Sequence, residues 1–522
     1  MGLVGPDEPR YAWIARAMAQ TRDWVTPRLY GQPWFEKPIL YYWLAAIGFL
    51  LHLPAEWAAR LPSAFAMLIA AISLGWLGER QYERSRAFWS PAILAPLLFS
   101  TTAAAIGFAR AGSPDAIFCG PLTVAMAAAA SILRKRGAIA SPGGDASIPS
   151  GSRDTLDLIF FGLALGLATL AKGPAAIILC GGAVGLWAIC TRRWRAAFRL
   201  LHPLSIATFL LFALPWYLIC ALRNPDFLRI FILEHNFGRY LTNEFQHRQP
   251  FWFFLPVTLV ALLPWTAALW LVTRRAAGTW REKLRSDSPS LFFACWAIFP
   301  IAFFSFSQSK LPGYILPAIP PLSLLCAVAI ARAARTGSSA CSGIARWLGL
   351  SLVSFGVAAL VIAGRPPAAL GGAAHVRTAA LSFGFATLLL GILFAGPIDS
   401  RRKHLAVPIT LLFVASAVEF LNFAVLPSLD WLYSARPYAE LLHNDLRKDR
   451  LFVYQLPRSW DFGLAFYFSR ELPEWSPTDP EPALVLTQQR QIPGLRKMGR
   501  VQGDVSEPYG GIEVVPIAPA RR

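Results

Sequence analysis

The chain has 522 residues, of which 55% are hydrophobic and 15% are charged, and its formal net charge is +19. Soluble domains carry about 25% charged residues, so this composition excludes an ordinary soluble protein and indicates a polytopic membrane protein. The basic residues are dispersed between apolar stretches instead of being gathered on one domain, which argues against nucleic acid as a partner.

Residues 1–58 are predicted to form an outer loop with interfacial helices. Two short motifs in this loop combine acids, cations and aromatic rings: Gly5–Tyr11 (GPDEPRY) and Trp34–Pro38 (WFEKP). Ionisable groups at the edge of a bilayer add nothing to stability, so they mark a candidate site. The apolar stretch 39–53 is too short to cross comfortably and suits a helix lying in the interface, with a short or tilted span as the alternative.

Residues 59–426 are predicted to form the transmembrane helical domain, because a helix needs about 20 apolar residues to cross the hydrocarbon. Twelve stretches come near this length: 59–79, 88–108, 115–133, 155–171, 174–191, 203–222, 252–272, 290–307, 313–331, 346–364, 379–397 and 405–426. Lys and Arg gather in alternate loops, which the positive-inside rule places in the cytoplasm. The other loops hold almost all of the ionisable motifs and are expected outside. Because Asp7 then lies outside as well, we expect one further span before Met1, which brings the total to thirteen.

Residues 427–522 are predicted to form a small α/β domain on the outer face. Charged residues and prolines increase here, β-like runs occur at 451–454 and 483–486, and residues 434–448 have helical spacing. The predicted fold class is therefore mainly α, a polytopic membrane protein with about 12 to 13 transmembrane helices, outer juxtamembrane helices and a small C-terminal α/β domain.

Five motifs follow one another along the first 320 residues: Gly5–Ala12, Trp34–Pro38, Glu234–His235, Gln246–Trp252 and Ser309–Pro317. Together they resemble landmarks of the bacterial aminoarabinose-transferase and protein-mannosyltransferase-like membrane glycosyltransferases, which belong to the C-type glycosyltransferase superfamily. The resemblance implies a multi-pass protein of the bacterial inner (plasma) membrane, with its active site and C-terminal domain in the periplasm. It also implies a sugar donor linked to polyprenyl phosphate.

Sugar transfer from a lipid phosphate needs a carboxylate that receives the acceptor's proton and cations that hold the leaving phosphate. The resemblance implies that Asp7 is the catalytic base, that Glu8 supports or tunes it, and that Asp115 holds the cations of the site or binds the sugar. The alternatives are structural: Asp7 caps a helix that begins at Pro9, and Asp115 caps the next span.

The candidate groups for substrate or phosphate binding are cations, a histidine and phenols near the outer surface: Arg10, Tyr11, Lys37, Arg110, Lys172, Arg239, His247, Arg248, Lys310 and Tyr314. For Lys172 the alternative is snorkelling to the membrane interface. Glu36 and His235 are the candidate pair for a divalent metal ion, with a structural ion pair as the alternative for Glu36. No other cofactor is expected.

The leading functional hypothesis is the transfer of an aminoarabinose-type sugar from polyprenyl phosphate to lipid A. The second hypothesis keeps the donor lipid but takes protein hydroxyls as acceptors, as in a protein O-mannosyltransferase. A third hypothesis, from another class, is a lipid flippase or transporter. It predicts inverted halves, spans broken at Gly or Pro and charges near the middle of the membrane.

Overall fold

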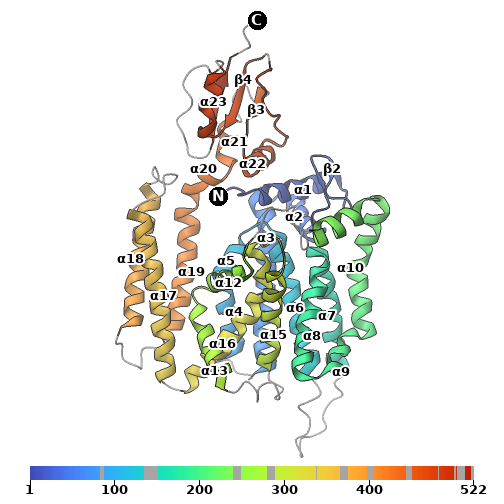
Figure 1. Ribbon diagram of the computed structural model, residues 1–522, viewed down its shortest axis with the longest axis vertical. Helices are drawn as coiled ribbons and strands as arrows, with labels where there is room; N and C mark the ends of the chain where they lie inside the picture. Colours follow the sequence, from blue (N-terminus) through green and yellow to red (C-terminus); the bar gives the residue numbers. More distant parts are fainter. Residues whose placement is uncertain are drawn as a thin grey trace, which may run out of the picture.

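Apolar helices form the body of the protein, because a backbone inside hydrocarbon must satisfy its hydrogen bonds within its own helix. Figure 1 shows these helices side by side, with a smaller C-terminal part above one end of the bundle, which we call the site end. The computed structural model describes residues 1–82, 87–134, 151–238, 249–278, 289–336, 338–364, 374–396, 405–442, 450–479, 481–498, 501 and 512–518.

Within these residues, eight helical segments are long and apolar enough to cross a membrane. They are α3 (Ala55–Gln81), α6 (Pro114–Arg134), α7 (Gly151–Lys172), α10 (Pro203–Arg223), η4 (Pro312–Ala318) continued by α16 (Ile319–Thr336), α17 (Ser338–Gly364), α18 (Ala374–Ala395), and α19 (Ala406–Phe420) continued by η7 (Leu421–Val425).

Two further apolar segments are bent helix pairs. The first joins α4 (Pro91–Ser100) and α5 (Ala103–Ala109) at 62°. The second joins α12 (Phe254–Ala261), which follows the short η3 (Phe251–Phe253), to α13 (Thr266–Gly278) at 112°. If each pair is one span, the described residues contain ten.

The twelve predicted stretches each coincide with one of these segments or with a shorter apolar helix. The shorter helices are α8 (Ala175–Thr191) and α15 (Pro289–Ser305). A third short apolar helix, α2 (Leu40–Leu50), occupies the stretch predicted to lie in the interface. The mainly helical polytopic fold is therefore confirmed, whereas the span expected before Met1 stays a prediction.

The first helix, α1 (Asp7–Thr21), lies across the site end, where it packs on α2 and on α22 (Arg458–Phe468). A hairpin of β1 (Arg28–Leu29) and β2 (Gln32–Pro33) follows it. The turn residues Tyr30 and Gly31 have φ of 51° and 81°, as a type I′ turn requires. This turn reverses the chain, and the motif Trp34–Pro38 then connects β2 to α2.

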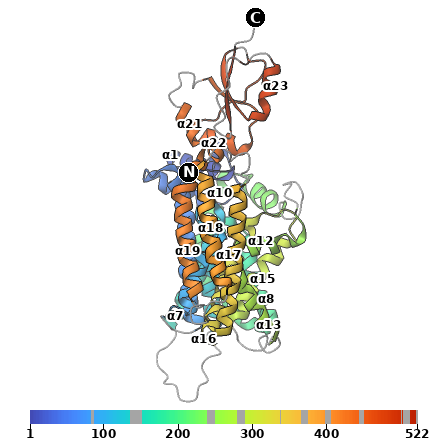
Figure 2. The ribbon, with the colours of Figure 1, turned by 90° about the vertical axis from the view of Figure 1, so that its left-hand side faces the viewer.

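On the far side of the bundle, α17 and α18 pack face to face through glycines, and Figure 2 shows them beside α19. A Cβ on Gly349 would lie 2.5 Å from the amide nitrogen of Ala395, and one on Gly391 would lie 2.6 Å from that of Val353. Small residues let membrane helices approach to backbone contact, which replaces the missing hydrophobic drive between helices in lipid.

The C-terminal part carries a three-stranded sheet in the order β3-β4-β5, with β3 (Leu451–Val453) parallel and β5 (Glu513–Ile517) antiparallel to β4 (Ala483–Thr487). The predicted β-like runs correspond to β3 and β4. The helices of this part are η8 (Pro427–Leu429), α20 (Asp430–Tyr433), α21 (Arg436–Leu442), α22, η10 (Gln489–Gln491) and α23 (Ile492–Lys497). The domain boundaries at residues 58 and 426 stay predictions.

The remaining described elements connect the spans. A short α9 (Trp194–Ala197) and η1 (Phe198–Leu201) link α8 to α10 at the end of the bundle opposite the site end, and a π-helix, η2 (Arg229–Gly238), follows α10.

Candidate active site

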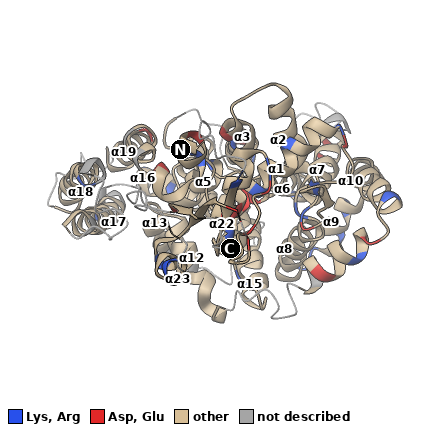
Figure 3. Ribbon diagram, turned by 90° about the horizontal axis from the view of Figure 1, so that it is seen from above, with Lys and Arg blue, Asp and Glu red and all other residues tan. Residues whose placement is uncertain are grey.

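The first of the two N-terminal motifs, Gly5–Tyr11, contains the start of α1. The helix begins at Asp7 after Pro6, and no side chain caps it, so the alternative in which Asp7 caps a helix that starts at Pro9 is wrong. Asp7 and Glu8 both lie in the first turn, where negative charge is favourable beside the unpaired N–H groups of the helix. In the view from above, acidic and basic segments meet near α1 and α22 (Figure 3).

Arg10 connects the motif Gly5–Tyr11 to the motif Trp34–Pro38. Its Nη2 lies 2.6 Å from the Asp7 carboxylate and 3.1 Å from that of Glu36. The guanidinium carbon lies 5.4 Å from the ring centre of Trp34 and 5.8 Å from that of Phe462, which belongs to α22. Burial alone would lower the pKa of Arg10, but the neighbouring carboxylates outweigh it and raise this pKa. Arg10 is therefore a permanent cation held by the carboxylates of Asp7 and Glu36 and by the rings of Trp34 and Phe462.

Asp7 is the acid of this group that opens to the surface, since 61% of its side chain is exposed. Shielding by the surrounding elements nevertheless raises the pKa of Asp7; Arg10 opposes this rise and Glu36 adds to it. A carboxylate that is open on one side and has a raised pKa suits a general base, because it is accessible and binds a proton more readily than an ordinary aspartate.

Glu36 and Lys37 complete the charged cluster that Asp7 and Arg10 begin. Glu36 is only 9% exposed and lies between Arg10 and Lys37, whose Nζ is 3.5 Å from the carboxylate. The structure therefore shows the ion pair that was the alternative to metal binding for Glu36. Asp7 and Lys37 also interact electrostatically with Asp115, which connects this cluster to α6.

Tyr11 lies beside Arg10 but is fully enclosed. Its ring centre lies 5.7 Å from that of Tyr41 and 6.1 Å from that of Tyr42. Burial, followed by the charge of Glu36, raises the pKa of Tyr11 well above its ordinary value, so the phenol stays protonated. Its position supports a packing role beneath Arg10.

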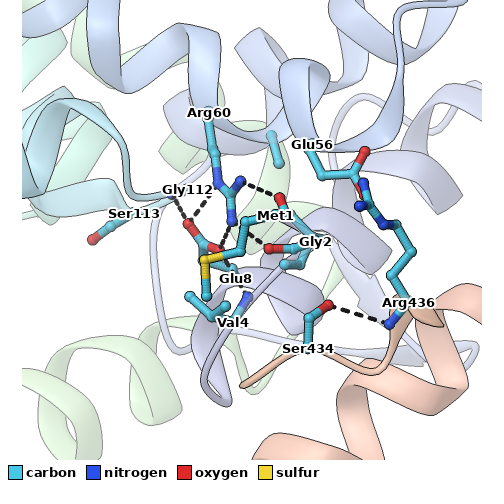
Figure 4. A network of polar contacts seen from close by, with 12 residues as sticks. Met1, Gly2, Val4, Glu8, Glu56, Arg60, Gly112, Ser113, Ser434 and Arg436 are labelled. Carbon is cyan, nitrogen blue, oxygen red and sulfur yellow. Dashed lines mark hydrogen bonds and ion pairs between the residues drawn. The ribbon is translucent and has the colours of Figure 1, made fainter. Parts of the chain in front are cut away.

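Glu8 is buried and bound on all sides, in contrast to its neighbour Asp7. Its carboxylate accepts hydrogen bonds from the amides of Val4 (2.9 Å) and Gly112 (2.6 Å). It also accepts bonds from Nε (3.2 Å) and Nη2 (2.7 Å) of Arg60 on α3 (Figure 4). With four donors on two oxygens, Glu8 has the surroundings of a structural carboxylate that holds α1 against α3 and the loop after α5.

The same network reaches the C-terminal part. Arg60 also donates to the carbonyl oxygens of Met1 (2.9 Å) and Gly2 (2.7 Å). The Gly2 amide donates to Asp430 (2.7 Å), and Arg436 pairs with the same carboxylate at 2.6 Å. The start of α1 is therefore fixed both to the bundle and to residues more than 400 positions away.

Asp115 and Lys172 form a second ion pair at the mouth of the bundle. Ser113 Oγ accepts a hydrogen bond from the Asp115 amide at 3.2 Å, so Ser113 serves as the N-terminal cap of α6. The alternative in which Asp115 caps this helix is therefore not supported. Lys172 Nζ lies 5.0 Å from the ring centre of Tyr314. Because Lys172 pairs with a carboxylate beside an aromatic face, it is held in place and does not simply snorkel.

Three further predicted site residues lie in the described part: Arg110 and Lys310, which were predicted to bind substrate or phosphate, and His235, which was predicted to hold a metal ion. Arg110 follows α5, and partial burial followed by the charge of Arg60 lowers the pKa of Arg110. Lys310 is buried and donates from Nζ to the carbonyl oxygen of Ser307 at 2.5 Å, and desolvation lowers its pKa. His235 lies in η2. The remaining three predicted residues lie outside the described residues: Arg239, His247 and Arg248.

In the described part of the chain, no group of three or more His, Cys, Asp or Glu side chains is placed to hold a metal ion. Glu36 is already neutralised by Arg10 and Lys37, which disfavours a further cation at this carboxylate. Metal binding by Glu36 and His235 stays a prediction.

An apolar groove with a volume of about 430 Å³ lies next to the second ion pair, between α5, α12 and η4. Phe108, Val257 and Ile315 are among its lining residues. A Cβ on Gly313 would lie 2.9 Å from the Phe108 ring and 3.0 Å from Asp115 Oδ2, so the wall of the groove and the carboxylate meet at this glycine. The charged cluster thus borders a space suited to a hydrocarbon chain.

The fold is that of the C-type membrane glycosyltransferases, a helical bundle that here carries carboxylates, cations and an apolar groove at one end. The whole chain superposes on ArnT from Cupriavidus metallidurans bound to undecaprenyl phosphate, with a TM-score of 0.75, 23% identity and coverage of 100% of this chain and 96% of that chain. Residues 2–231 match the family described as dolichyl-phosphate-mannose-protein mannosyltransferase.

Curated relatives place the chain within this class. It is 33% identical over 325 residues to the undecaprenyl phosphate-alpha-4-amino-4-deoxy-L-arabinose arabinosyl transferase of Edwardsiella ictaluri, which covers 62% of this chain and 55% of that protein. The corresponding protein of Erwinia tasmaniensis is 33% identical over 363 residues, which covers 68% of this chain and 60% of that protein. The chain thus spans somewhat more than half the length of these relatives.

The chain belongs to the aminoarabinose-transferase and protein-mannosyltransferase-like family, as its motifs predicted. The structure also adds residues that the motifs did not reveal. Arg60 holds Glu8, Phe462 covers Arg10, and Ser113 caps the helix of Asp115. A cation at the start of an apolar stretch was the only signal for Arg60, and Phe462 had none.

Proposed function

We propose that this protein is an integral membrane glycosyltransferase that moves a sugar from a polyprenyl-phosphate donor to an acceptor, most simply an aminoarabinose-type sugar to lipid A. The observation that carries the proposal is the open Asp7 carboxylate beside Arg10, Glu36 and Lys37, in electrostatic contact with the Asp115–Lys172 pair. The apolar groove beside Asp115 offers room for a prenyl chain next to these charges. The names of the curated relatives support the same donor.

In the proposed reaction, an acceptor hydroxyl oxygen forms a bond to the anomeric carbon of the sugar. The bond between that carbon and the phosphate oxygen breaks, and polyprenyl phosphate leaves with the electron pair. Asp7 takes the hydroxyl proton as the new bond forms. Lys37 and Lys172 offset the negative charge that develops on the leaving phosphate.

Arg10 has a positioning role in this scheme. Its contacts with Asp7 and Glu36 fix the base at the edge of the cluster, and the rings of Trp34 and Phe462 fix Arg10. A base held in one orientation needs little reorganisation when the acceptor arrives. Glu8 acts one step further away, by fixing the start of α1.

The proposed location is the bacterial inner membrane, with the site end in the periplasm. The basic segment 192–199 runs from the end of α8 through α9 into η1, at the opposite end of the bundle, which agrees with a cytoplasmic position under the positive-inside rule (Figure 1). Asp7, Glu36 and the C-terminal part then share the outer side, where lipid A or an exported protein is available as acceptor.

A protein O-mannosyltransferase is the second candidate, because the matching family model is described by protein mannosylation. The flippase hypothesis finds one point of support in the bent pairs α4–α5 and α12–α13. However, the described ion pairs of the site lie at one end of the bundle, whereas a transporter needs its binding groups near the middle of the membrane.

Purified protein in liposomes tests the proposal. Donor lipids carrying aminoarabinose or mannose are supplied with either lipid A or a hydroxyl-rich peptide, and the products are weighed by mass spectrometry. We expect lipid A to gain one aminoarabinose with wild type and to remain unmodified with Asp7→Asn. Transfer to the peptide instead would establish the second candidate. Movement of the intact donor across the bilayer without transfer would establish the flippase.

A further inference from the structure

The end of the bundle opposite the active site carries a second feature with ligand-binding chemistry. The segment of α9 and η1, residues Trp194–Leu201, connects the apolar helices α8 and α10. α8 ends at Thr191 and α10 begins at Pro203, so the segment lies where two membrane helices end, at the level of the lipid headgroups (Figure 1).

One side of this segment is apolar and exposed. Trp194, Phe198 and Leu201 expose 48%, 63% and 60% of their surfaces, and their spacing of four and three residues places them on the same side of a helical turn. Exposed rings at a membrane surface insert between acyl chains. The segment therefore has the properties of an interfacial anchor.

Phe198 of this apolar side also borders a cavity of about 310 Å³, whose other lining residues are Ile132, Asp154, Leu158, Arg199 and His202. Among the described residues, no hydrogen bond or ion pair engages the guanidinium of Arg199. His202 Nδ1 accepts the Leu204 amide at 3.2 Å, so the neutral ring carries its hydrogen on Nε2. Arg199 and His202 thus bring hydrogen-bond donors to one cavity that is otherwise largely apolar.

We propose that this cavity binds the phosphodiester headgroup of a membrane glycerophospholipid. Arg199 and His202 donate to the phosphate oxygens, and Phe198 and Leu158 contact the upper acyl chains. Arg199 is the one Lys or Arg among the lining residues, which matches the single charge of a phosphodiester better than the double charge of a phosphate monoester. This site is independent of the proposed glycosyl transfer.

The segment supplies its own control for a binding experiment. Arg195 is exposed and does not line the cavity, so Arg195→Gln removes the same charge four residues away from Arg199. Native mass spectrometry of the detergent-purified full chain with added phosphatidylglycerol measures the fraction that retains lipid. We expect Arg199→Gln to reduce retention at least about fivefold, Arg195→Gln to change it less than about twofold, and Arg199→Lys to recover part of it.

Three results would overturn the proposal. Wild type that retains no phosphatidylglycerol at this site has no such binding. Equal losses in the Arg195 and Arg199 variants show a diffuse basic surface without a built cavity. Displacement of the lipid by millimolar glycerol 3-phosphate shows that a soluble phosphate is the ligand. Thermal unfolding of each variant, measured alongside, separates loss of binding from loss of fold.

Discussion

The adjacent acids Asp7 and Glu8 should separate cleanly into one residue that serves the reaction and one that serves the fold. Asp7 is 61% exposed and contacts Arg10, whereas Glu8 is buried among four hydrogen-bond donors. We compare Asp7→Asn with Glu8→Gln, because each replaces a carboxylate by an amide of the same size. The expected effects differ in kind.

The structure sets the magnitude for Glu8→Gln. Oε1 accepts from Gly112 and from Arg60 Nε, and Oε2 accepts from Val4 and from Arg60 Nη2. An amide retains one of these oxygens and turns an NH₂ group toward two donors, so two bonds are lost and Arg60 loses its counter-charge. Breaking a buried pair in this way costs about 3–5 kcal/mol. Asp7→Asn loses one partly exposed ion pair, which is worth about 1 kcal/mol or less.

Thermal unfolding in detergent and single-turnover sugar transfer measure the two effects separately. Glu8→Gln should lower the apparent unfolding temperature by several degrees, and the properly folded fraction should keep measurable transfer. Asp7→Asn should unfold near wild type and lose at least about 100-fold in rate, the usual contribution of a general base. An Asp7→Asn protein that transfers at the wild-type rate refutes the base assignment. A Glu8→Gln protein of wild-type stability refutes the structural one.

Three further outcomes follow from neighbouring contacts. Glu36→Gln should move the acid limb of the pH–rate profile to lower pH, because Glu36 helps to raise the pKa of Asp7 and the base works only when deprotonated. An acid limb at the same or a higher pH contradicts this. Lys37→Met should reduce the transfer rate about 10²- to 10³-fold with little change in unfolding temperature, since its ion pair is 3.5 Å long and its charge serves the leaving phosphate; equal activity with wild type excludes it from the site. Gly349→Ala should destabilise the fold by about 1–3 kcal/mol, because its Cβ meets the backbone of α18, whereas Gly343→Ala on the same helix meets nothing within 4 Å and should be neutral; the apparent unfolding temperatures of the two variants decide this.

Hydropathy is a local property, and for that reason the helices could be predicted from the sequence while their bends could not. The stretch 88–108 reads as one apolar run, yet the chain turns by 62° between α4 and α5. Thr102 Oγ1 accepts the Ala105 amide at 3.2 Å and so starts a second helix. A threonine in an apolar run commonly bonds back within its own helix, so the sequence alone does not mark this position as a break.

Pairings over long sequence separations explain what the motifs missed at the site. Glu8 and Arg60 are each visible as charges near an apolar run, but 52 residues separate them and neither specifies the other. The motif reading therefore treated Glu8 as a companion of Asp7 in the reaction. The structure turns it away from Asp7 toward Arg60 in the same helical turn, because residues adjacent in a helix point about 100° apart.

Residues of the C-terminal part contribute to the site through their contact with Arg10. Arg10 lies between Asp7 and Glu36 from the front of the chain, and Phe462 of α22 covers it at 5.8 Å. Arg16, two turns further along α1, donates to the carbonyl oxygen of Phe466 at 2.9 Å and lies 4.2 Å from its ring centre. Two arginines six positions apart on α1 thus contact two phenylalanines four positions apart on α22. These two contacts fix α22 against α1, so the C-terminal part helps to set the position of the cation that orients the base.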